Sequence, residues 1–331
     1  MISVIIPVYD GAQYVDGLCE ALRAQALQDF EVIFINDGSR DQTLDRISSW
    51  QRDASLCIKI IDQENGGVSA ARNAGIDAAS GSHLCFVDVD DLPRPNYLSD
   101  LFAAFTGEVD AVFCKQQLSR IGIAEAVPPG ETGSIRRVDR LECLRDFLYG
   151  RLISGCCTMM IRTEVVIKAE LRFAESYKFS EDLHFVWRAI ASCRSIAYVD
   201  STLYVYMLQS ESATSRFTEE RLHGFQLMKS LEEHFDRAAP AFASEFRRYG
   251  AARIAWSIAW QSAVRLSHRD YLEFVHTHPL RSELAKLLRF PDVSVAASSF
   301  VFVLNARLFR RLVQLRVSPA TARTPHSRSL L

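Results

Sequence analysis

The sequence predicts an α/β protein with a doubly wound, mostly parallel sheet and a C-terminal helical extension. Short, β-branched apolar runs recur at 2–8, 30–37 and 57–62, and segments with helical patterns separate them. Strands and helices that alternate at this spacing are typical of βαβ units, whose strands are covered on both faces. After residue 217, apolar residues keep helical spacing and no convincing strand pattern returns, which predicts the extension.

The N-terminal half supports this prediction element by element. Apolar residues at helical spacing follow the first strand. After the second strand, Ser39 and Gln42 form an S-x-x-Q pattern, which predicts a capping box at the start of a helix. The stretch 65–81 reads as a Gly-rich turn, a helix and a terminal glycine, and the run HLCFVDVD at 83–90 reads as the fourth strand.

The middle of the chain continues the pattern less regularly. Residues 117–137 are rich in Gly, Pro and charge, and they are interpreted as an excursion from the sheet. The loop 209–216, with Ser210, Ser212 and Ser215, is small and polar, so it is either a lid over a bound ligand or an idle surface loop. The strands expected here are 110–116, 155–161 and 196–207, and the helices are 137–150 and 179–192.

We divide the chain into a domain at 1–217 and a helical extension at 218–331. Within the extension, a long helix is expected at about 241–267. Residues 293–317 begin apolar and then carry arginines among leucines, as in a basic amphipathic helix. Such a helix either lies on an anionic membrane surface or packs on its own domain with its arginines in solvent. The tail at 318–331 is predicted to be disordered.

The composition narrows the class of protein. With 48% hydrophobic and 24% charged residues among 331, the chain is globular, and its net charge of -2 gives no general attraction to nucleic acid. The 8 cysteines form no CxxC pair and are expected to be buried free thiols, with a redox role for adjacent Cys156 and Cys157 as a minor alternative. Without a signal peptide or an apolar run of ~20 residues, a cytoplasmic location is expected, with peripheral contact at the inner face of the membrane as an alternative.

Acidic residues gather where the strands are expected to end. Asp10 follows the first strand, Asp37 ends the second, and Asp88, Asp90 and Asp91 end the fourth. Ligands bind at the edge of a parallel sheet where its carboxyl ends meet. Because residues two apart on a strand share a face, Asp88 and Asp90 are expected to converge. Hard carboxylate oxygens suit Mg²⁺ or Mn²⁺, usually shared with phosphate. The alternative is that Asp91 caps a turn and that the other two aspartates are solvated.

Five stretches, taken together, resemble a known family. SVIIPVYDGAQYVDGLCEAL, FEVIFINDGSRDQT, NGGVSAARNAGIDAASG and FVDVDD follow the order and spacing of family 2 glycosyltransferases with the GT-A fold, and FSEDLHFVWRA resembles that family's acidic-pair motif. The resemblance covers about residues 1–217. Departures are small: Asp10 and Asn36 stand where the family often has Asn and Asp, and Ser180 stands where Gly is common.

The resemblance implies an inverting, metal-dependent glycosyltransferase of the hexosyltransferase class. The donor would be a nucleoside-diphosphate sugar, most often a UDP-sugar, and the acceptor a hydroxyl of a glycan or of a lipid-linked molecule in polysaccharide biosynthesis. Asp90 would bind Mn²⁺ or Mg²⁺ directly, Asp88 would contact the metal or the ribose, and Asp91 would support the site. The donor-binding residues would be Pro7, Val8, Tyr9, Asp10, Asp37, Arg72, Asp88 and Val89.

Four of the implied roles have plainer alternatives. Asp182 would be the general base for the attacking hydroxyl and Glu181 would position it, although both also favour a helix N-terminus. Asp37 would accept a hydrogen bond from the base, or would only interact with the dipole of the next helix. Arg72 would meet the base or the phosphates, or would be a surface helix arginine.

Other functions fit the residues less well. A nucleotidyltransferase usually carries a Gly-rich phosphate loop near its N-terminus, which IIPVYDGAQ lacks, and no GxGxxG follows the first strand as a dinucleotide dehydrogenase would require. A nucleotide-sugar-binding or scaffold protein without turnover is the alternative of another class. The presence of both Asp90 and Asp182 argues against it.

Overall fold

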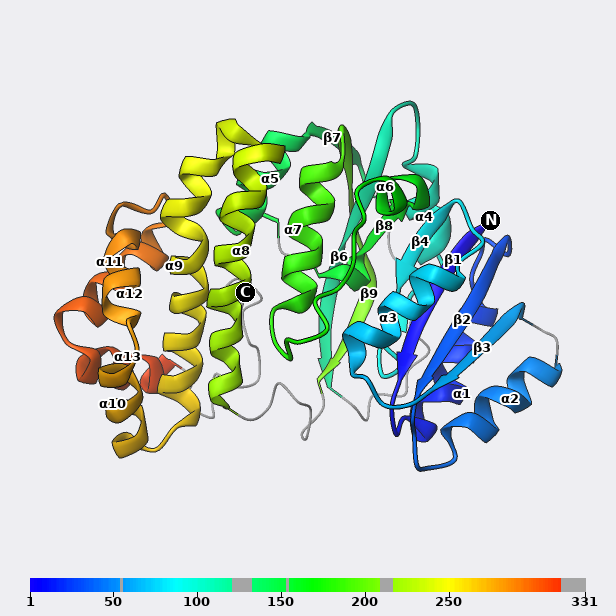
Figure 1. Cartoon of the computed structure of the whole chain (residues 1–331), viewed down its shortest axis with the longest axis horizontal. Helices are drawn as coiled ribbons and strands as arrows, with labels where there is room; N and C mark the ends of the chain where they lie inside the picture. The colour runs from blue at the N-terminus through cyan, green and yellow to red at the C-terminus, as the bar shows by residue number, and fades with distance from the viewer. Residues whose placement is uncertain (54–55, 121–132, 153–154, 209–216, 317–331) are drawn as a thin grey trace. The chain divides into compact units, whose positions relative to one another are not determined.

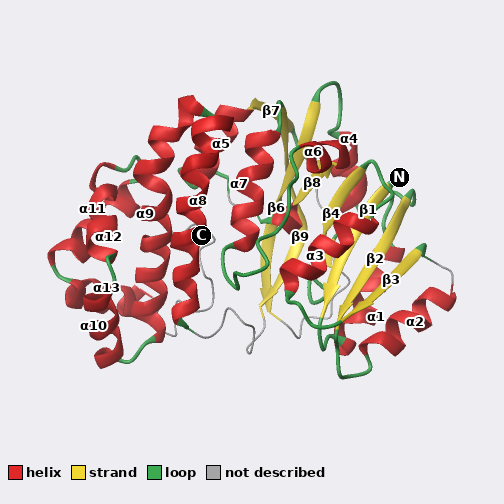
Figure 2. Cartoon of the chain, in the orientation of Figure 1, coloured by secondary structure: helices red, strands yellow, loops and turns green. Residues whose placement is uncertain are grey.

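The structure is a computed structural model that describes residues 1–53, 56–120, 133–152, 155–208 and 217–316. The chain forms two compact units, Met1–Cys143 with Ser154–Gln209 and Leu144–Ile153 with Ser210–Leu331 (Figure 1). All strands of the described residues belong to the first unit, and the second is helical (Figure 2). The proposed catalytic domain at 1–217 stays a prediction, and the loop 209–216 and the tail 318–331 lie outside the described residues.

Among its described residues, the first unit contains a sheet of 9 strands. These are β1 (Ile2–Val8), β2 (Phe30–Asp37), β3 (Ile58–Gln63), β4 (His83–Phe86), β5 (Leu92–Pro93), β6 (Val109–Arg120), β7 (Ile135–Asp139), β8 (Met159–Arg162) and β9 (Ser195–Leu208). Their order is β3-β2-β1-β4-β8-β6-β9-β5, with β7 paired to β9. Neighbours from β3 to β4 are parallel, as are β6 and β9. Strand β8 is antiparallel to β4 and β6, and β5 and β7 are antiparallel to β9.

Helices cover the parallel part of this sheet. In front of β1 and β2 lies α3 (Val68–Ala78), which approaches closely because Gly75 has no side chain (Figure 1). A Cβ at Gly75 would lie 2.3 Å from Cγ2 of Ile5. The doubly wound, mostly parallel sheet that the apolar runs predicted is confirmed, with antiparallel pairs at β8, β5 and β7. The other helices of this unit are α1 (Ala12–Arg23), α2 (Thr43–Asp53), α4 (Tyr97–Ala103), α6 (Thr163–Lys168) and α7 (Glu181–Ser192), with a 3-10 turn at Cys156–Thr158.

The second unit packs around the long helix α9 (Pro240–Arg265). Small residues such as Ala255 and Ala259 on α9 leave room for aromatic rings, and Phe302 and Phe309 share this core. The remaining helices are α8 (His223–Ala238), α10 (His268–Thr277), α11 (Leu280–Lys286), α12 (Val293–Leu304) and α13 (Ala306–Arg316), with 3-10 turns at Glu219–Leu222 and Leu287–Arg289. Helix α5 (Arg140–Leu148) begins in the first unit and ends in the second. No described helix combines the length and the apolar character that a membrane span requires.

Several local predictions were wrong. The S-x-x-Q capping box does not form, because the hydroxyl of Ser39 accepts a hydrogen bond from Asp10 N instead (3.0 Å). Oδ1 of Asp41 accepts the hydrogen bond from Thr43 N, the first residue of α2. The excursion at 117–137 contains strand at both described ends, since β6 runs to Arg120 and β7 starts at Ile135. All 8 cysteines are free, as expected, but Cys57 is exposed.

The single basic helix predicted at 293–317 is two helices. Asn305 adopts an extended conformation, with φ -155° and ψ 99°, between α12 and α13. Its Oδ1 accepts a hydrogen bond from Leu308 N at 3.0 Å, so Asn305 caps the N-terminus of α13. The periodicity of apolar residues continues across the break, which is why the sequence did not reveal it.

Candidate active site

The acidic residues after β4 lie on a turn and not on a strand, which corrects the prediction for 83–90. Val87 N still donates to Ile5 O in the sheet at 3.0 Å, but Asp91 N then donates to Asp88 O at 3.1 Å, closing a turn. Strand alternation therefore does not explain how Asp88 and Asp90 are placed. Both are partly exposed, whereas Asp91 is buried.

Tyr204 on β9 holds this turn in place. Its hydroxyl accepts a hydrogen bond from Asp88 N at 3.2 Å and donates to Oδ2 of Asp91 at 2.9 Å, while Met207 N donates to Oδ1 of Asp91 at 2.8 Å. Burial, together with the charge of Asp88, raises the pKa of Asp91 to about 8. Asp91 thus fixes the turn, and its role in supporting a metal site stays a prediction. Nothing in the sequence singled out Tyr204, whose partners are distant along the chain.

Helix α7 begins with an acidic pair, Glu181 and Asp182. Glu181 is buried and Asp182 is partly exposed, and Oδ1 of Asp182 accepts a hydrogen bond from Leu183 N at 2.7 Å. A Cβ at Gly155 would lie 3.7 Å from Oδ2 of Asp182. Ser180, which precedes the pair, has φ 67° and ψ 12°, in the left-handed region that glycine adopts without steric cost.

We expect Ser180→Gly to stabilise the protein by about 0.5–1 kcal/mol, because glycine removes the Cβ clash that the left-handed conformation imposes. Ser180→Ala, which keeps the Cβ, is the matched control and is expected to give no such gain. Urea unfolding of the three proteins measures the difference. An equal change in both variants would show that the backbone conformation is not the cause.

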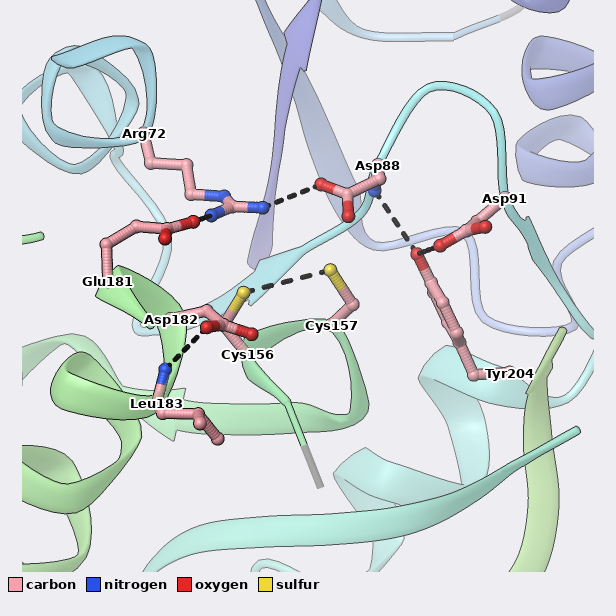
Figure 3. Close-up of polar contacts among 9 residues, drawn as sticks. All are labelled: Arg72, Asp88, Asp91, Cys156, Cys157, Glu181, Asp182, Leu183 and Tyr204. Atoms are coloured by element: carbon pink, nitrogen blue, oxygen red, sulfur yellow. Dashed lines mark hydrogen bonds and ion pairs between the residues drawn. The ribbon is translucent and has the colours of Figure 1, made fainter. Parts of the chain in front are cut away.

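Arg72 on α3 contacts both the acidic turn after β4 and the acidic pair at the start of α7. Its Nη2 lies 2.8 Å from Oδ1 of Asp88, and its Nη1 lies 3.5 Å from Oε1 of Glu181 (Figure 3). The guanidinium carbon also lies 5.1 Å from the ring centroid of Phe173. Arg72 is only 5% exposed, so it is not the surface arginine of the plainer interpretation. It brings the turn after β4 and the start of α7 into one site.

Asn73, the next residue, ties the loop before α7 to α3. Its side chain donates to Phe173 O at 3.0 Å and accepts from Phe173 N at 2.9 Å, as a neighbouring strand would. The ring of Phe173 stacks on Phe185 of α7, with centroids 4.1 Å apart. Asn73 and Phe173 therefore fix the start of α7 relative to Arg72. Sequence reasoning missed both residues, although Asn73 stands in the AARNAG stretch that carried the resemblance.

The acidic pair of α7 titrates above its ordinary range. Burial raises the pKa of Glu181 to about 7, and the charge of Asp182 adds to the effect while Arg72 opposes it. Burial also raises the pKa of Asp182, again against the influence of Arg72. A carboxylate whose pKa lies nearer neutrality is a stronger base than an exposed one.

Asp37 organises the loop that opens α3. Its Oδ1 accepts hydrogen bonds from Gly66 N at 2.9 Å and from Nε2 of Gln63 at 2.8 Å, and its Oδ2 accepts from Gly67 N at 2.8 Å. Gly67 has φ 87°, which suits glycine alone. Asp37 therefore fixes the turn before α3, and both base recognition and the interaction with the dipole of the next helix stay predictions.

Residues at the end of β1 and just after it differ in how far they are exposed. Pro7 and Val8 are buried in the strand, while Tyr9 is 46% exposed. Oδ1 of Asp10 accepts a hydrogen bond from Arg40 N at 2.7 Å, which joins the loops after β1 and β2. A Cβ at Gly11 would lie 3.1 Å from Cγ1 of Val89. Val89 therefore packs against the segment after β1, and the acidic turn lies beside it.

The donor set after β4 fits a metal ion shared with a ligand. No group of three or more His, Cys, Asp or Glu side chains that could hold a metal ion occurs in the part of the chain that is described. Asp88 and Asp90 both carry partly exposed carboxylates on one turn. Mg²⁺ is commonly bound through one or two carboxylates together with substrate phosphates and water. These residues match that pattern and not a site made entirely of protein groups.

Comparison with known proteins assigns the chain to a family. The model of "Glycosyl transferase family 2" matches residues 3–168. The chain belongs to this family. The family 2 glycosyltransferase is 30% identical over 264 residues to the uncharacterized glycosyltransferase EpsJ of Bacillus subtilis, a match that covers 76% of this chain and 71% of the relative. The chain is therefore a transferase enzyme, as the motifs implied.

Solved structures confirm the GT-A fold. The TarS protein of Staphylococcus aureus in complex with UDP-GlcNAc gives a TM-score of 0.64 at 20% identity, with 95% of this chain and 90% of that chain covered. The mannosyltransferase PcManGT of Pyrobaculum calidifontis, in complex with GDP-Man and Mn²⁺, gives a TM-score of 0.52 at 15% identity, with 95% and 86% covered. At these identities the likeness concerns the fold of the glycosyltransferase alone.

Proposed function

We propose that this glycosyltransferase moves a sugar from a UDP-sugar to a hydroxyl of a glycan or lipid-linked acceptor, with inversion at the anomeric carbon. The observation that carries the proposal is the position of Arg72 between Asp88 and Glu181, since Arg72 contacts Asp88, 16 positions away, and Glu181, 109 positions away. This contact supports a single site that contains the donor-side carboxylate Asp88 and the candidate base Asp182, which follows Glu181 in the chain. The UDP-GlcNAc bound to TarS supports the choice of UDP.

Asp182 is the proposed general base. A sugar hydroxyl hardly ionises at neutral pH, so a carboxylate must accept its proton as it attacks. Burial raises the pKa of Asp182, which suits this task, and the hydrogen bond from Leu183 N orients the carboxylate. Glu181 is held by Arg72 and is proposed to position the pair.

Donor binding is proposed for the strand ends and the acidic turn. Tyr9 is exposed after β1 and offers a ring to the nucleoside, with Pro7, Val8 and Asp10 shaping the segment around it. Asp37 holds the glycine loop, whose backbone lies at the start of α3. Asp90 and Asp88 would hold Mn²⁺ or Mg²⁺, and the Mn²⁺ in the PcManGT complex supports this choice. When bound, the ion would neutralise charge on the leaving diphosphate.

A thermal-shift experiment tests the proposal. UDP at a hundredfold excess over its Kd stabilises the folded protein by about 2.7 kcal/mol, and we expect its melting shift only when Mn²⁺ or Mg²⁺ is present. Asp90→Asn should remove the metal-dependent part of the shift, and ADP serves as the nucleotide control. A UDP shift that needs no metal would overturn the metal assignment, and the absence of any nucleotide shift would overturn the choice of donor.

A further inference from the structure

Helices α12 and α13 expose a row of large apolar side chains. Leu304 is 64% exposed and Leu315 is 74% exposed, values unusual for leucine in a folded domain. The two helices contact each other through Phe302 and Phe309, whose ring centroids lie 5.2 Å apart. The exposed apolar side chains on them are Val293, Phe300, Leu304, Leu308, Leu312 and Leu315, which we call the apolar row.

The apolar row is not part of the core of the second unit. The inward faces of both helices are already filled by Phe302, Phe309 and Val313, which belong to the core of the second unit. Phe300 and Leu304 lie four residues apart, and Leu308 and Leu312 repeat this spacing, so each pair lies on one outward face. Each helix therefore has a second apolar face that is exposed in the described chain.

Arginines border the apolar row. Arg307 and Arg311 are exposed one position before Leu308 and Leu312, and Arg316 ends the helix. By contrast, Arg310 points inward, where its Nη2 donates to Leu266 O at 2.6 Å. Residues 293–316 contain four arginines and no acidic residue, although the whole chain has a net charge of -2. Positive charge is thus concentrated where the apolar side chains are exposed.

We propose that the apolar row and its bordering arginines bind the surface of an anionic lipid bilayer. An apolar face beside cationic side chains matches the boundary between acyl chains and anionic headgroups, where the leucines lose contact with water and the arginines meet phosphates. Nucleic acid offers phosphates but no hydrocarbon. A second copy of the chain would bring arginines opposite arginines. This inference does not depend on the proposed donor or metal.

Sedimentation of the full chain with vesicles tests this proposal. We expect binding to vesicles of equal parts phosphatidylcholine and phosphatidylglycerol, little binding to phosphatidylcholine alone, and weaker binding as salt rises. Leu308→Gln combined with Leu312→Gln should weaken binding at least about tenfold, and so should Arg307→Gln combined with Arg311→Gln. These positions are exposed, so unfolding curves should match the wild type.

A matched control distinguishes binding through the apolar row from nonspecific adsorption through any exposed apolar side chain. Ile167→Gln changes a side chain that is 65% exposed on α6, and it should leave vesicle binding unchanged. Equal binding to both kinds of vesicle, or equal losses in the Ile167 and leucine variants, would overturn the proposal. So would a concentration-dependent dimer that the leucine variant abolishes without any vesicle binding, since the occupant would then be a second copy.

Discussion

Asp182→Asn is expected to lower the rate of sugar transfer by about 10²–10⁴-fold while nucleotide affinity stays unchanged. Asparagine keeps the oxygen that accepts the hydrogen bond from Leu183 N, but it cannot accept the proton of the attacking hydroxyl. Release of UDP from a UDP-sugar in the presence of acceptor measures the rate, and thermal shift measures nucleotide binding. A protein that only binds or carries nucleotide sugars would behave alike in both forms.

Asp45→Asn is the matched control for this substitution. Asp45 lies in the first turn of α2 as Asp182 lies in the first turn of α7, so both interact with a helix dipole. If the dipole were the whole role of Asp182, the two variants would lose similar, small amounts of stability and no activity. The wild-type rate should also fall as pH falls through the raised pKa of Asp182, because the protonated form cannot act as a base.

Arg72→Ala should produce the largest loss of stability, about 3–5 kcal/mol in the free energy of unfolding. The substitution leaves the buried Glu181 without its counter-charge and removes one partner of Asp88. It also removes the guanidinium from the ring of Phe173. Urea unfolding measures the effect. Transfer activity should fall as well, because Arg72 joins the acidic turn to the start of α7.

Two further variants serve as comparisons for the stability loss expected of Arg72→Ala. Arg46→Ala removes an exposed pair with Asp16 and should cost less than about 1 kcal/mol. Arg72→Lys keeps a positive charge but has no planar fork to reach two carboxylates, so it should lie between Arg72→Ala and the wild type. If Arg72→Ala were no worse than Arg46→Ala, the buried arginine would not hold the site together.

The parallel half of the sheet could be predicted because burial on both faces leaves a local signature. Residues 2–8 and 30–37 are strands with the predicted bounds. The end of β4 could not be read from the same signal, since the turn at Asp88 depends on the hydroxyl of Tyr204 from another strand. Strand β5, of two residues, and helices α4 and α6 are too short to show a period.

Within the site, the family resemblance implied that Asp88 and Glu181 belong to one site, but no sequence pattern showed what holds them. The carboxylates of Asp88 and Glu181 were placed together only through the resemblance, because their common partner Arg72 lies on a third element. The clamp of Asn73 on Phe173 pairs a helix with a loop 100 positions away, which no local pattern encodes. Ser180 is different: its departure from glycine was visible in the sequence, and the left-handed backbone gives the physical reason that glycine is common at this position.

The glycine loop bound by Asp37 has a consequence for the thermodynamics of ligand association. Gly66 and Gly67 are the residues with the most backbone freedom to lose, and their amides are already fixed by one carboxylate. A nucleotide bound at this edge of the sheet, as proposed, would meet a preorganised surface, so little conformational entropy of the loop would be lost on association. The conformational entropy of the loop is lost during folding and not on binding, so more of the interaction free energy with the ligand would contribute to affinity.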